Sequence, residues 1–443
     1  MSKRLFGTDG IRAVAGEEPL DPSTVRRFGA ALAQRLGGPR IVLGRDTRES
    51  GPWLRDALTA GCAAQGGEAV DAGVVTTPGL AWILRHGGFD AGVMISASHN
   101  PFADNGLKAF DRDGCKLGDD VEREIESLIL DHGIADPGAN GASPSVDVSG
   151  VDGYVEHLLG TTGARRLDGL SIALDCANGA ACEIAPRVFR ELGADVHAIG
   201  VEPDGRNINL DCGSLHLDRL AAFVRKEGCD LGLALDGDAD RCLAVDRQGR
   251  VVDGDAILYI TGRHLKRRGH LPGDGLVATI MSNFWLEERL AAEGVTLHRA
   301  SVGDKYVLEM MHAEKLTLGG EQSGHVIFRE HATTGDGILT GMQLIDAILA
   351  GDEPLDSIVD SIEPYPQLLI NVRVQEKPDL RVHPVIGPAV TATEDALAGS
   401  GRVVLRYSGT EPLVRVMLEG KNADQVRQET ERLAGVIEDE LGV

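Results

Sequence analysis

The chain has 443 residues, more than one hydrophobic core usually holds, which predicts three or more domains with ligand clefts between them. Its 44 basic and 68 acidic residues give a net charge of −24, which argues against a surface for nucleic acid or for an acidic membrane. We therefore expect a local basic pocket to hold any anionic ligand.

The cysteines and the amino-terminal segment indicate where the protein is found. Seven cysteines, an odd number without a C-x-x-C pair, indicate neither a disulfide framework nor a zinc site and suit a reducing compartment. The start, MSKRLFGTDGIRAV, reaches Gly7 and Asp9 before an apolar signal region develops, and no later stretch resembles a membrane span. We expect a soluble, cytoplasmic protein.

Three segments repeat one plan: a short apolar strand, a polar loop, an amphipathic helix and a second strand led by glycine. The first strands contain short, continuous apolar runs at 41–43, 172–174 and 276–278. Such runs are typical of strands buried on both faces of a mostly parallel sheet. Each helix ends near a common stop signal, namely Gly66, Gly193 and Gly294. The pattern predicts three similar α/β domains with mixed, mostly parallel sheets.

Changes in composition mark the expected domain boundaries. DPGANGASPSVDVSG separates the first unit from the second, and DRQGRVVDGD precedes the third. After SIEPYPQ, the segment LLINVRV alternates like a half-exposed strand, and NADQVRQETERLAGVIEDELG predicts a closing helix. We therefore predict α/β domains at 1–148, 149–250 and 251–363, followed by a smaller α+β domain at 364–443.

Two arginine-bearing stretches lie early in the chain. GTDGIR ends in Arg12, which is a candidate for stabilising negative charge. GRDTRESG contributes Arg45 and Arg48, and its composition predicts a structural loop before a helix that starts near Ser50.

The segment VMISASHNP, residues 93–101, ends an apolar run at a cluster of polar side chains. On local sequence alone, Ser98 is best explained as the cap of a turn. A hydrolase nucleophile would need a G-x-S-x-G elbow or a positioned Ser-His-Asp triad, and ASHNP lacks the elbow. Lys108 lies ten residues further on, and a lone lysine is usually a solvated surface charge.

The segment LGLALDGDADRCLAVD carries the strongest signal. A predicted buried strand, 231–235, is followed by three carboxylates and an arginine: Asp236, Asp238, Asp240 and Arg241. Carboxylates this close repel one another, and a hard cation relieves the repulsion, with Mg²⁺ favoured beside phosphate. An EF-hand would need Gly and Glu where Arg241 and Arg247 stand. A dehalogenase-like phosphatase usually opens its domain with its Asp-x-Asp pair, whereas this pair lies mid-chain. Two alternatives stay open: such a phosphatase using Asp236, which would release phosphate, and a solvated acidic turn.

Two later glycine-rich loops carry polar side chains. GGEQSGHVIF, residues 319–328, contains groups of the kind that bind sugar hydroxyls: Glu321, Ser323 and His325. RYSGTEPLVRV combines arginines and hydroxyls as a phosphate nest does, at Arg406, Ser408, Thr410 and Arg415. Taken alone, each loop could equally be a surface turn.

In this order, FGTDGIR, SASHNPFADNGLK, DGDADR, GEQSGH and RYSGTEP resemble the α-D-phosphohexomutase superfamily over nearly the whole chain. The opening motif, Gln322, the SGTEP loop and the length are most similar to the bacterial branch that isomerises glucosamine phosphates. The branch that acts on mannose and glucose phosphates stays open, because Phe284, Trp285 and Lys305 look less typical in the third domain.

The resemblance implies four domains around a central cleft, with one loop from each. It implies that Ser98 is phosphorylated and that a phosphoserine oxygen joins Asp236, Asp238 and Asp240 around one Mg²⁺. It implies that sugar hydroxyls are bound by Glu321 and Ser323. It further implies that the non-reacting phosphate is held by Arg406, Ser408, Gly409, Thr410 and Arg415.

The same resemblance implies a phosphoryl-transfer mechanism. Lys108, ranked before His325, is the candidate for moving the hydroxyl proton, while Arg12 and Arg241 stabilise charge. The expected ligands are a phosphosugar and a bisphosphorylated sugar intermediate, in a step that supplies amino sugar for UDP-N-acetylglucosamine and the cell wall. The sequence does not decide the oligomeric state, so a homodimer stays open. A non-catalytic sugar-phosphate binder is the alternative, but it would not need the serine and the metal site together.

Overall fold

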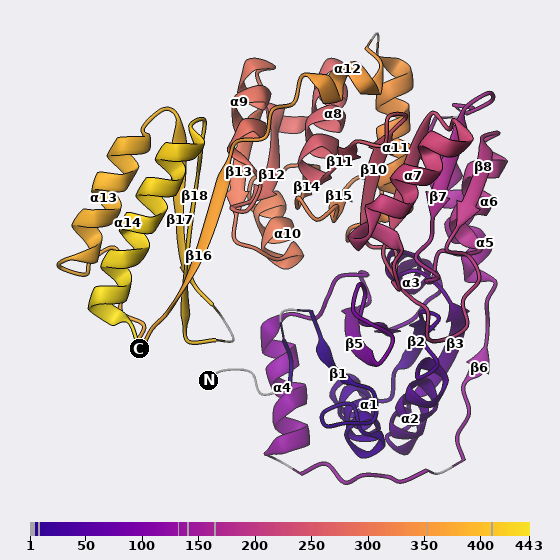
Figure 1. Ribbon diagram of the computed structural model, residues 1–443. Helices are drawn as coiled ribbons and strands as arrows, with labels where there is room; N and C mark the ends of the chain where they lie inside the picture. The colour runs from indigo at the N-terminus through magenta and orange to yellow at the C-terminus, as the bar shows by residue number, and fades with distance from the viewer. Residues whose placement is uncertain are drawn as a thin grey trace. The chain divides into compact units, whose positions relative to one another are not determined.

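The computed structural model describes residues 5–7, 9–131, 133–139, 141–163, 165–351, 353–408 and 411–443 (Figure 1). The chain divides into two compact units. The first comprises the residues up to Thr279 together with His298–Val359, and the second comprises Ile280–Leu297 and Asp360–Val443. No helix within the described ranges is both long and apolar enough to cross a lipid bilayer.

A six-stranded sheet opens the first unit. Its strand order is β1 (Ile11–Val14), β5 (Asp104–Asp111), β4 (Ala91–Ile95), β2 (Arg40–Arg45), β3 (Glu68–Val74) and β6 (Ser145–Val146). The strands β4, β2, β3 and β6 pair in parallel, whereas β5 runs antiparallel to both β4 and β1. The sheet is therefore mixed and mostly parallel, as predicted from the apolar run at 41–43.

Helices cover both faces of this sheet. Its helices are α1 (Pro22–Leu36), α2 (Gly51–Ala64), α3 (Thr77–His86), α4 (Asp119–Leu130) and α5 (Gly150–Gly160). Leu58 of α2 and Ile125 of α4 pack in one buried cluster with Ile41 and Leu43 of β2. Val42 points to the opposite face and is also buried, because successive side chains of a strand alternate.

A five-stranded sheet follows in the chain. Its order is β11 (Val251–Val252), β10 (Cys242–Asp246), β9 (Leu231–Leu235), β7 (Ser171–Asp175) and β8 (Asp195–Ile199). The strand β7 pairs in parallel with β8 and β9, and β10 is antiparallel to β9. Its helices are α6 (Ile184–Glu191) and α7 (Leu217–Glu227), with a short 3₁₀ turn at Gly213–Leu215. The predicted strand 231–235 is confirmed as β9, and the metal-ligand candidates follow its carboxyl end.

The third sheet has four strands in the order β13 (Thr296–Ala300), β12 (Gly275–Thr279), β14 (Leu318–Gly320) and β15 (Val326–Phe328). Its helices are α8 (Gly254–Arg267), α10 (Asp304–Ala313), α11 (Gly337–Ala350) and α12 (Leu355–Asp360), with a 3₁₀ turn at Pro272–Asp274. Val307 and Met311 of α10 pack against Val277 of β12 and Ile327 of β15. The loop between β14 and β15 carries the predicted sugar-binding segment.

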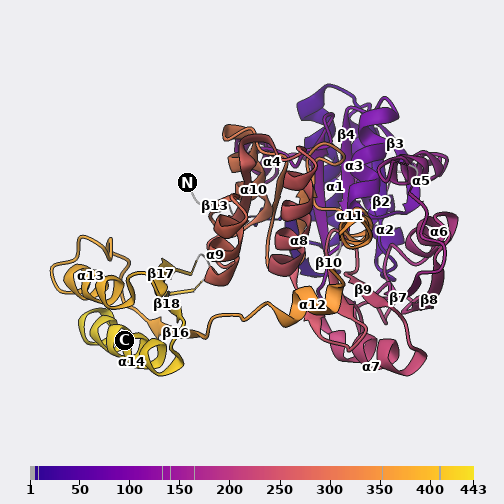
Figure 2. The same ribbon diagram turned by 90° about the horizontal axis from the view of Figure 1, so that it is seen from above.

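The second unit contains a three-stranded antiparallel sheet, in the order β16 (Gln367–Arg373), β18 (Leu413–Gly420) and β17 (Gly401–Tyr407). The helices α13 (Ile386–Leu397) and α14 (Ala423–Leu441) lie on one face of it (Figure 2). The helix α9 (Phe284–Ala292) also belongs to this unit, because Glu288 and Asn283 bond to Tyr365. The predicted fold class, three α/β domains and a smaller carboxyl-terminal α+β domain, is confirmed.

Candidate active site

The loop after β4 holds Ser98 in an uncommon backbone conformation. Ser98 is buried and has a φ of 51°, in the left-handed region that residues other than glycine rarely adopt. Its backbone N–H donates to Ser96 Oγ at 2.9 Å, and its hydroxyl donates to Asp236 Oδ2 at 2.5 Å. The Ser98 hydroxyl therefore donates to the loop after β9, and its oxygen also lies 3.2 Å from Nδ1 of the adjacent His99.

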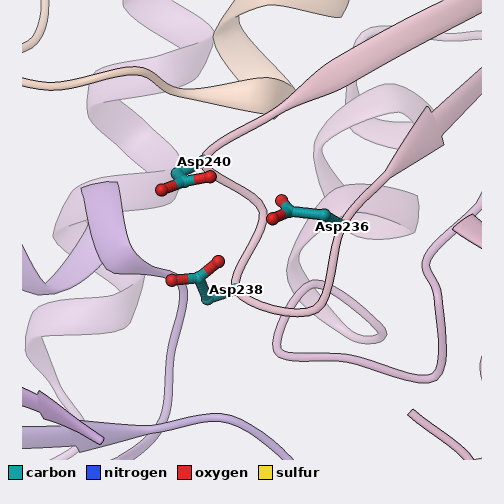
Figure 3. Close-up of side chains that lie close together, drawn as sticks. All are labelled: Asp236, Asp238 and Asp240. Carbon is teal, nitrogen blue, oxygen red and sulfur yellow. The ribbon is translucent and has the colours of Figure 1, made fainter. Parts of the chain in front are cut away.

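The loop between β9 and β10 places three carboxylates together. Asp236, Asp238 and Asp240 are buried, and one oxygen from each lies within 4.8 Å of the others (Figure 3). Gly237 permits this loop to approach the serine, because a Cβ at Gly237 would lie 2.5 Å from the carbonyl oxygen of Ser98. The glycine of the DGD motif thus brings the serine and the aspartates into contact.

The chemistry of these carboxylates fits a metal ion. Asp238 Oδ1 and Asp240 Oδ1 are buried and have no hydrogen-bond partner among the described residues, which costs free energy unless a cation pairs with them. Burial and the neighbouring charges of Asp240 and Asp238 raise the pKa of Asp236 well above its ordinary value. An oxygen-only set of this kind could hold a hard divalent cation.

Lys108 of β5 is buried against the same carboxylates. Its Nζ donates to Asp238 Oδ2 at 2.8 Å and to Asp240 Oδ2 at 3.4 Å, and it lies 3.2 Å from Asp9 Oδ2. Burial alone would lower the pKa of Lys108, but the charges of Asp238, Asp9 and Asp240 outweigh it and raise that pKa well above its ordinary value. Lys108 is therefore protonated at neutral pH. It is also buried, unlike the solvated surface lysine that its local sequence predicted.

His325, in the loop between β14 and β15, lies near the same oxygen of Asp240 as Lys108 does. Its Nδ1 is 3.7 Å from Asp240 Oδ2, and its Nε2 is 3.8 Å from Asp304 Oδ2. The backbone N–H of Gly335 donates to Nε2 at 3.0 Å, which places the proton of a neutral ring on Nδ1, toward Asp240. Burial lowers the pKa of His325, but Asp240, Asp304 and Glu321 outweigh it and raise that pKa.

Lys116 connects these groups into a closed ring in which basic and acidic side chains alternate. It forms ion pairs with both Asp9 and Asp304. The ring runs through Lys108, Asp9, Lys116, Asp304, His325 and Asp240, and back to Lys108. Asp9, Lys116 and Asp304 were not among the predicted site residues. Charged residues beside glycine in FGTDGIR and VGDKYV were available signals for Asp9 and Asp304.

A cleft of about 470 Å³ lies beside this ring. Four of the predicted functional residues line it together with Asp240, namely Arg12, Arg241, Glu321 and His325. Arg12, Lys116 and Arg241 bring three cations to this cleft, which is also lined by Asp9, Asp240, Asp304 and Glu321. The arginines can bind an anionic ligand while the carboxylates accept from its hydroxyl groups. Burial and the charges of Arg241 and Arg12 lower the pKa of His99, which also lines the cleft, to about 4, so its ring is neutral.

The predicted sugar-binding residues lie in one turn at this cleft. Glu321 Oε1 accepts a hydrogen bond from the backbone N–H of Gly303 at 3.0 Å, and Ser323 Oγ donates to Glu321 Oε2 at 3.4 Å. These contacts orient the Glu321 carboxylate and leave it lone pairs that can accept from sugar hydroxyls.

The predicted phosphate loop lies in the second unit, between β17 and β18. Arg406 and Arg415 are directly opposite each other in the antiparallel pair, and like charges in that position are destabilising. Burial and the charge of Arg415 lower the pKa of Arg406, and Arg415 Nε is buried without a partner among the described residues. The carbonyl oxygen of Ser408 accepts from Lys377 Nζ at 2.9 Å, which adds a cation that sequence analysis missed. Gly409 and Thr410 lie outside the described residues.

These features define a class of protein. The chain has a buried serine facing an acidic metal-type site, a cleft lined by arginines and carboxylates, and a separate arginine pair. Carried by three α/β domains and an α+β domain, these features are the architecture of a phosphohexomutase. Family models for phosphoglucomutase/phosphomannomutase match the chain in order: domain I at residues 3–133, domain II at 152–249, domain III at 253–365 and the C-terminal domain at 369–436.

Curated relatives narrow the assignment. A phosphoglucosamine mutase from Solibacter usitatus is 49% identical over 446 residues, covering 100% of both chains. Phosphoglucosamine mutases from Symbiobacterium thermophilum and Moorella thermoacetica are 48% and 47% identical, covering 99% and 96% of both chains. The chain belongs to the phosphoglucosamine mutases of the phosphoglucomutase/phosphomannomutase family and is an isomerase.

Solved structures share the fold at lower identity. A phosphoglucomutase/phosphomannomutase family protein from Burkholderia thailandensis superimposes with a TM-score of 0.80 at 24% identity, covering 98% of this chain and 97% of that one. The N-acetylphosphoglucosamine mutase of Aspergillus fumigatus, solved in complex with GlcNAc-6P and magnesium, gives a TM-score of 0.69 at 19% identity, covering 99% and 96%.

Proposed function

We propose that this chain interconverts glucosamine 6-phosphate and glucosamine 1-phosphate. The family assignment supports this substrate pair, because the curated relatives are phosphoglucosamine mutases over their whole length. The observation that carries the chemistry is the 2.5 Å contact between the Ser98 hydroxyl and Asp236, at the edge of a carboxylate set suited to a divalent cation.

Ser98 is proposed to carry the phosphoryl group as phosphoserine. In the first transfer the bond from phosphorus to Ser98 Oγ breaks and a bond from phosphorus to the free sugar O1 or O6 forms. The proton of the sugar hydroxyl is transferred in net to Ser98 Oγ, the leaving oxygen, so that the serine regains its hydroxyl. The product is glucosamine 1,6-bisphosphate. This intermediate then turns over and returns its other phosphoryl group to Ser98, which regenerates the phosphoserine and releases the isomer.

Charge neutralisation and positioning dominate phosphoryl transfer. Asp236, Asp238 and Asp240, with a phosphoserine oxygen, would hold Mg²⁺, which neutralises charge on the donor phosphate when bound. Arg12 and Arg241, which line the cleft, are placed to stabilise negative charge on the phosphosugar. The chain carries a net charge of −24, so local cations such as these arginines are needed to bind an anionic substrate.

Lys108 is proposed first for the proton movements, with His325 second. Because the surrounding carboxylates raise its pKa, Lys108 acts as a proton donor and a fixed positive charge rather than as a general base. His325 keeps its Nδ1 proton toward Asp240 Oδ2, the same carboxylate oxygen that Lys108 contacts.

The remaining predicted residues are proposed to bind the ends of the substrate. Glu321 and Ser323 accept and donate hydrogen bonds to sugar hydroxyls. The non-reacting phosphate is held by Arg406, Ser408, Gly409, Thr410 and Arg415. We place the reaction in the cytoplasm, where it supplies amino sugar for UDP-N-acetylglucosamine and the cell wall.

The test compares turnover of glucosamine, glucose and mannose phosphates by the purified chain, with the intact mass recorded before and after incubation with the bisphosphate. We expect isomerisation of glucosamine phosphates to dominate and the mass to rise by one phosphoryl group on Ser98. Dominant activity on mannose or glucose phosphates would instead assign the other branch of the family. Net release of phosphate, or binding without turnover, would reject the mutase function.

A further inference from the structure

Arg48 is a fully buried arginine that lies under the serine loop. Its relative exposure is 1%, and it is among the largest side chains that the fold buries completely. Its guanidinium donates to Asp46 Oδ2 at 2.9 Å and to four backbone carbonyl oxygens, those of Ser98, Asn100, Pro101 and Asp104. A buried charge is costly unless it is paired and hydrogen-bonded, and each nitrogen of this guanidinium has an acceptor.

Three of the four carbonyl groups, those of Ser98, Asn100 and Pro101, belong to the loop between β4 and β5, and Asp104 opens β5. The three loop carbonyls lie outside any strand, so side chains and turn contacts must satisfy them where they are buried. The planar fork of an arginine can serve several acceptors at once, which a lysine ammonium cannot do in the same geometry. The side chain of Arg48 thus supplies hydrogen-bond donors that a neighbouring strand would otherwise provide to this backbone.

Asp46 also holds the backbone N–H of Ser98, through the hydroxyl of Ser96. Asp46 Oδ2 accepts from the hydroxyl of Ser96 at 2.6 Å, and Ser96 Oγ accepts from the backbone N–H of Ser98 at 2.9 Å. The backbone carbonyl of Ser98 accepts from Arg48 Nη2 at 3.0 Å. Both backbone polar groups of Ser98 are therefore tied to the Asp46 and Arg48 pair, which fixes the left-handed φ of 51° that directs its hydroxyl at Asp236.

The same short segment also bonds to the part of the chain that carries the aspartates. Thr47 Oγ1 donates to the carbonyl oxygen of Asn178 at 2.6 Å, and the backbone N–H of Glu49 donates to the carbonyl oxygen of Gly205 at 3.0 Å. Asn209 Nδ2 donates to Ser98 O at 2.9 Å, the same carbonyl that Arg48 holds. Residues 46–49 thus set the position of the serine loop relative to the loop after β9.

We propose that Arg48 is a positioning residue for phosphoryl transfer, which holds the backbone of Ser98 so that the donor oxygen faces the metal-ligand carboxylates. The inference rests on the proposed function, because it concerns the same serine. Arg48 contacts no reacting atom and lines no part of the substrate cleft. Its loss therefore slows the transfer step, measured as kcat, and leaves KM for the phosphosugar within about twofold of its original value.

The primary test is R48K, which retains a positive charge beside Asp46 but removes the fork. We expect kcat, and the single-turnover loss of the phosphoryl group from Ser98 measured by intact mass, to fall roughly a hundredfold, as small misplacements of reacting groups do. The matched control is R55K, the same exchange at a partly buried arginine of α2 that pairs with Asp56 and Asp71. R55K should leave kcat and KM unchanged.

A second variant keeps the inference testable if R48K does not fold. Asn209 has a φ of 57°, so N209G removes the amide that holds Ser98 O without straining the backbone. We expect a several-fold fall in kcat with an unchanged KM. Folded R48K or N209G with unchanged kcat, or with a change in KM alone, would overturn the inference. Each kcat is compared with that of the unmodified chain on the hexose phosphate that the unmodified chain turns over best. A wrong substrate assignment would therefore appear in the unmodified chain itself and would not alter this comparison.

Discussion

Lys108 Nζ donates a 2.8 Å hydrogen bond to Asp238 Oδ2, and both side chains are buried. The lysine comes from an antiparallel strand of the first sheet, and the aspartate comes from the loop after β9 in the second sheet. The pair therefore joins two domains at the point where the serine and the carboxylates meet. Its strength follows from burial, because charges in a water-poor site interact more strongly than they do at the surface.

Replacing Lys108 tests whether this cation takes part in the transfer. We expect K108M to lower kcat by about two to four orders of magnitude, the usual contribution of a positioned proton donor. The pKa of Lys108 is raised in the folded chain. Its ion pairs with the carboxylates are therefore fully formed below its pKa in the unfolded chain, and they are lost only as pH rises through its pKa in the folded chain. The ratio of kcat for the two proteins should therefore be flat between pH 6 and pH 9. A ratio that changes steeply in that range would show that Lys108 titrates there as a base.

The three carboxylates predict that a divalent cation stabilises the fold as well as the reaction. Asp238 Oδ1 and Asp240 Oδ1 accept no hydrogen bond among the described residues, so a bound ion would supply a partner for two buried oxygens. Mg²⁺ at a hundred times its dissociation constant should stabilise the folded chain by about 2.7 kcal/mol through mass action. Differential scanning calorimetry with Mg²⁺ and with EDTA measures this shift. The shift should vanish in D236N/D238N, and activity lost in EDTA should return with Mg²⁺.

The ion pair of Lys116 and Asp304 predicts a strong coupling between the first and third sheets. Both side chains are largely buried, and removing Lys116 leaves Asp9 and Asp304 facing each other. We expect K116M to lower the free energy of unfolding by roughly 3 kcal/mol, as loss of one member of a buried pair does. K116M/D304N should cost less than the two single changes together. The exposed pair Arg123–Asp120 is the matched control, and R123M should cost less than about 1 kcal/mol.

Much of the architecture could be predicted from the pattern of apolar residues. The runs at 41–43, 172–174 and 276–278 lie in β2, β7 and β12, and the predicted final helix is α14. Continuous apolar runs bounded by glycine are a strong signal because they reflect burial on both faces of a sheet. The aspartate cluster could also be predicted, because its members lie at alternate positions of one short segment. Carboxylates this close repel one another, which indicates that a cation binds between them.

The contacts between distant segments could not be predicted from local sequence. Lys108 appears as an isolated charge, and its burial depends on carboxylates more than a hundred residues away. Arg48 appears as part of a structural loop, and the sequence does not show that its guanidinium supports Ser98. Both roles depend on how loops from separate sheets meet, which the propensities of neighbouring residues do not specify.

The last prediction concerns Asp336, the residue that caps α11 and accepts a 2.7 Å hydrogen bond from the hydroxyl of Tyr154. Burial raises the pKa of Asp336 to about 6, against an ordinary value of 3.8. A group with a raised folded pKa contributes its stability below the unfolded value and loses it as pH rises through the folded value. The unmodified chain should therefore lose about 2–3 kcal/mol between pH 4 and pH 7 from this residue, since each pKa unit corresponds to about 1.4 kcal/mol. Urea unfolding of D336N and of the unmodified chain across this range measures the effect. The difference between the two free energies should shift in favour of D336N as pH rises, and a constant difference would contradict the raised pKa.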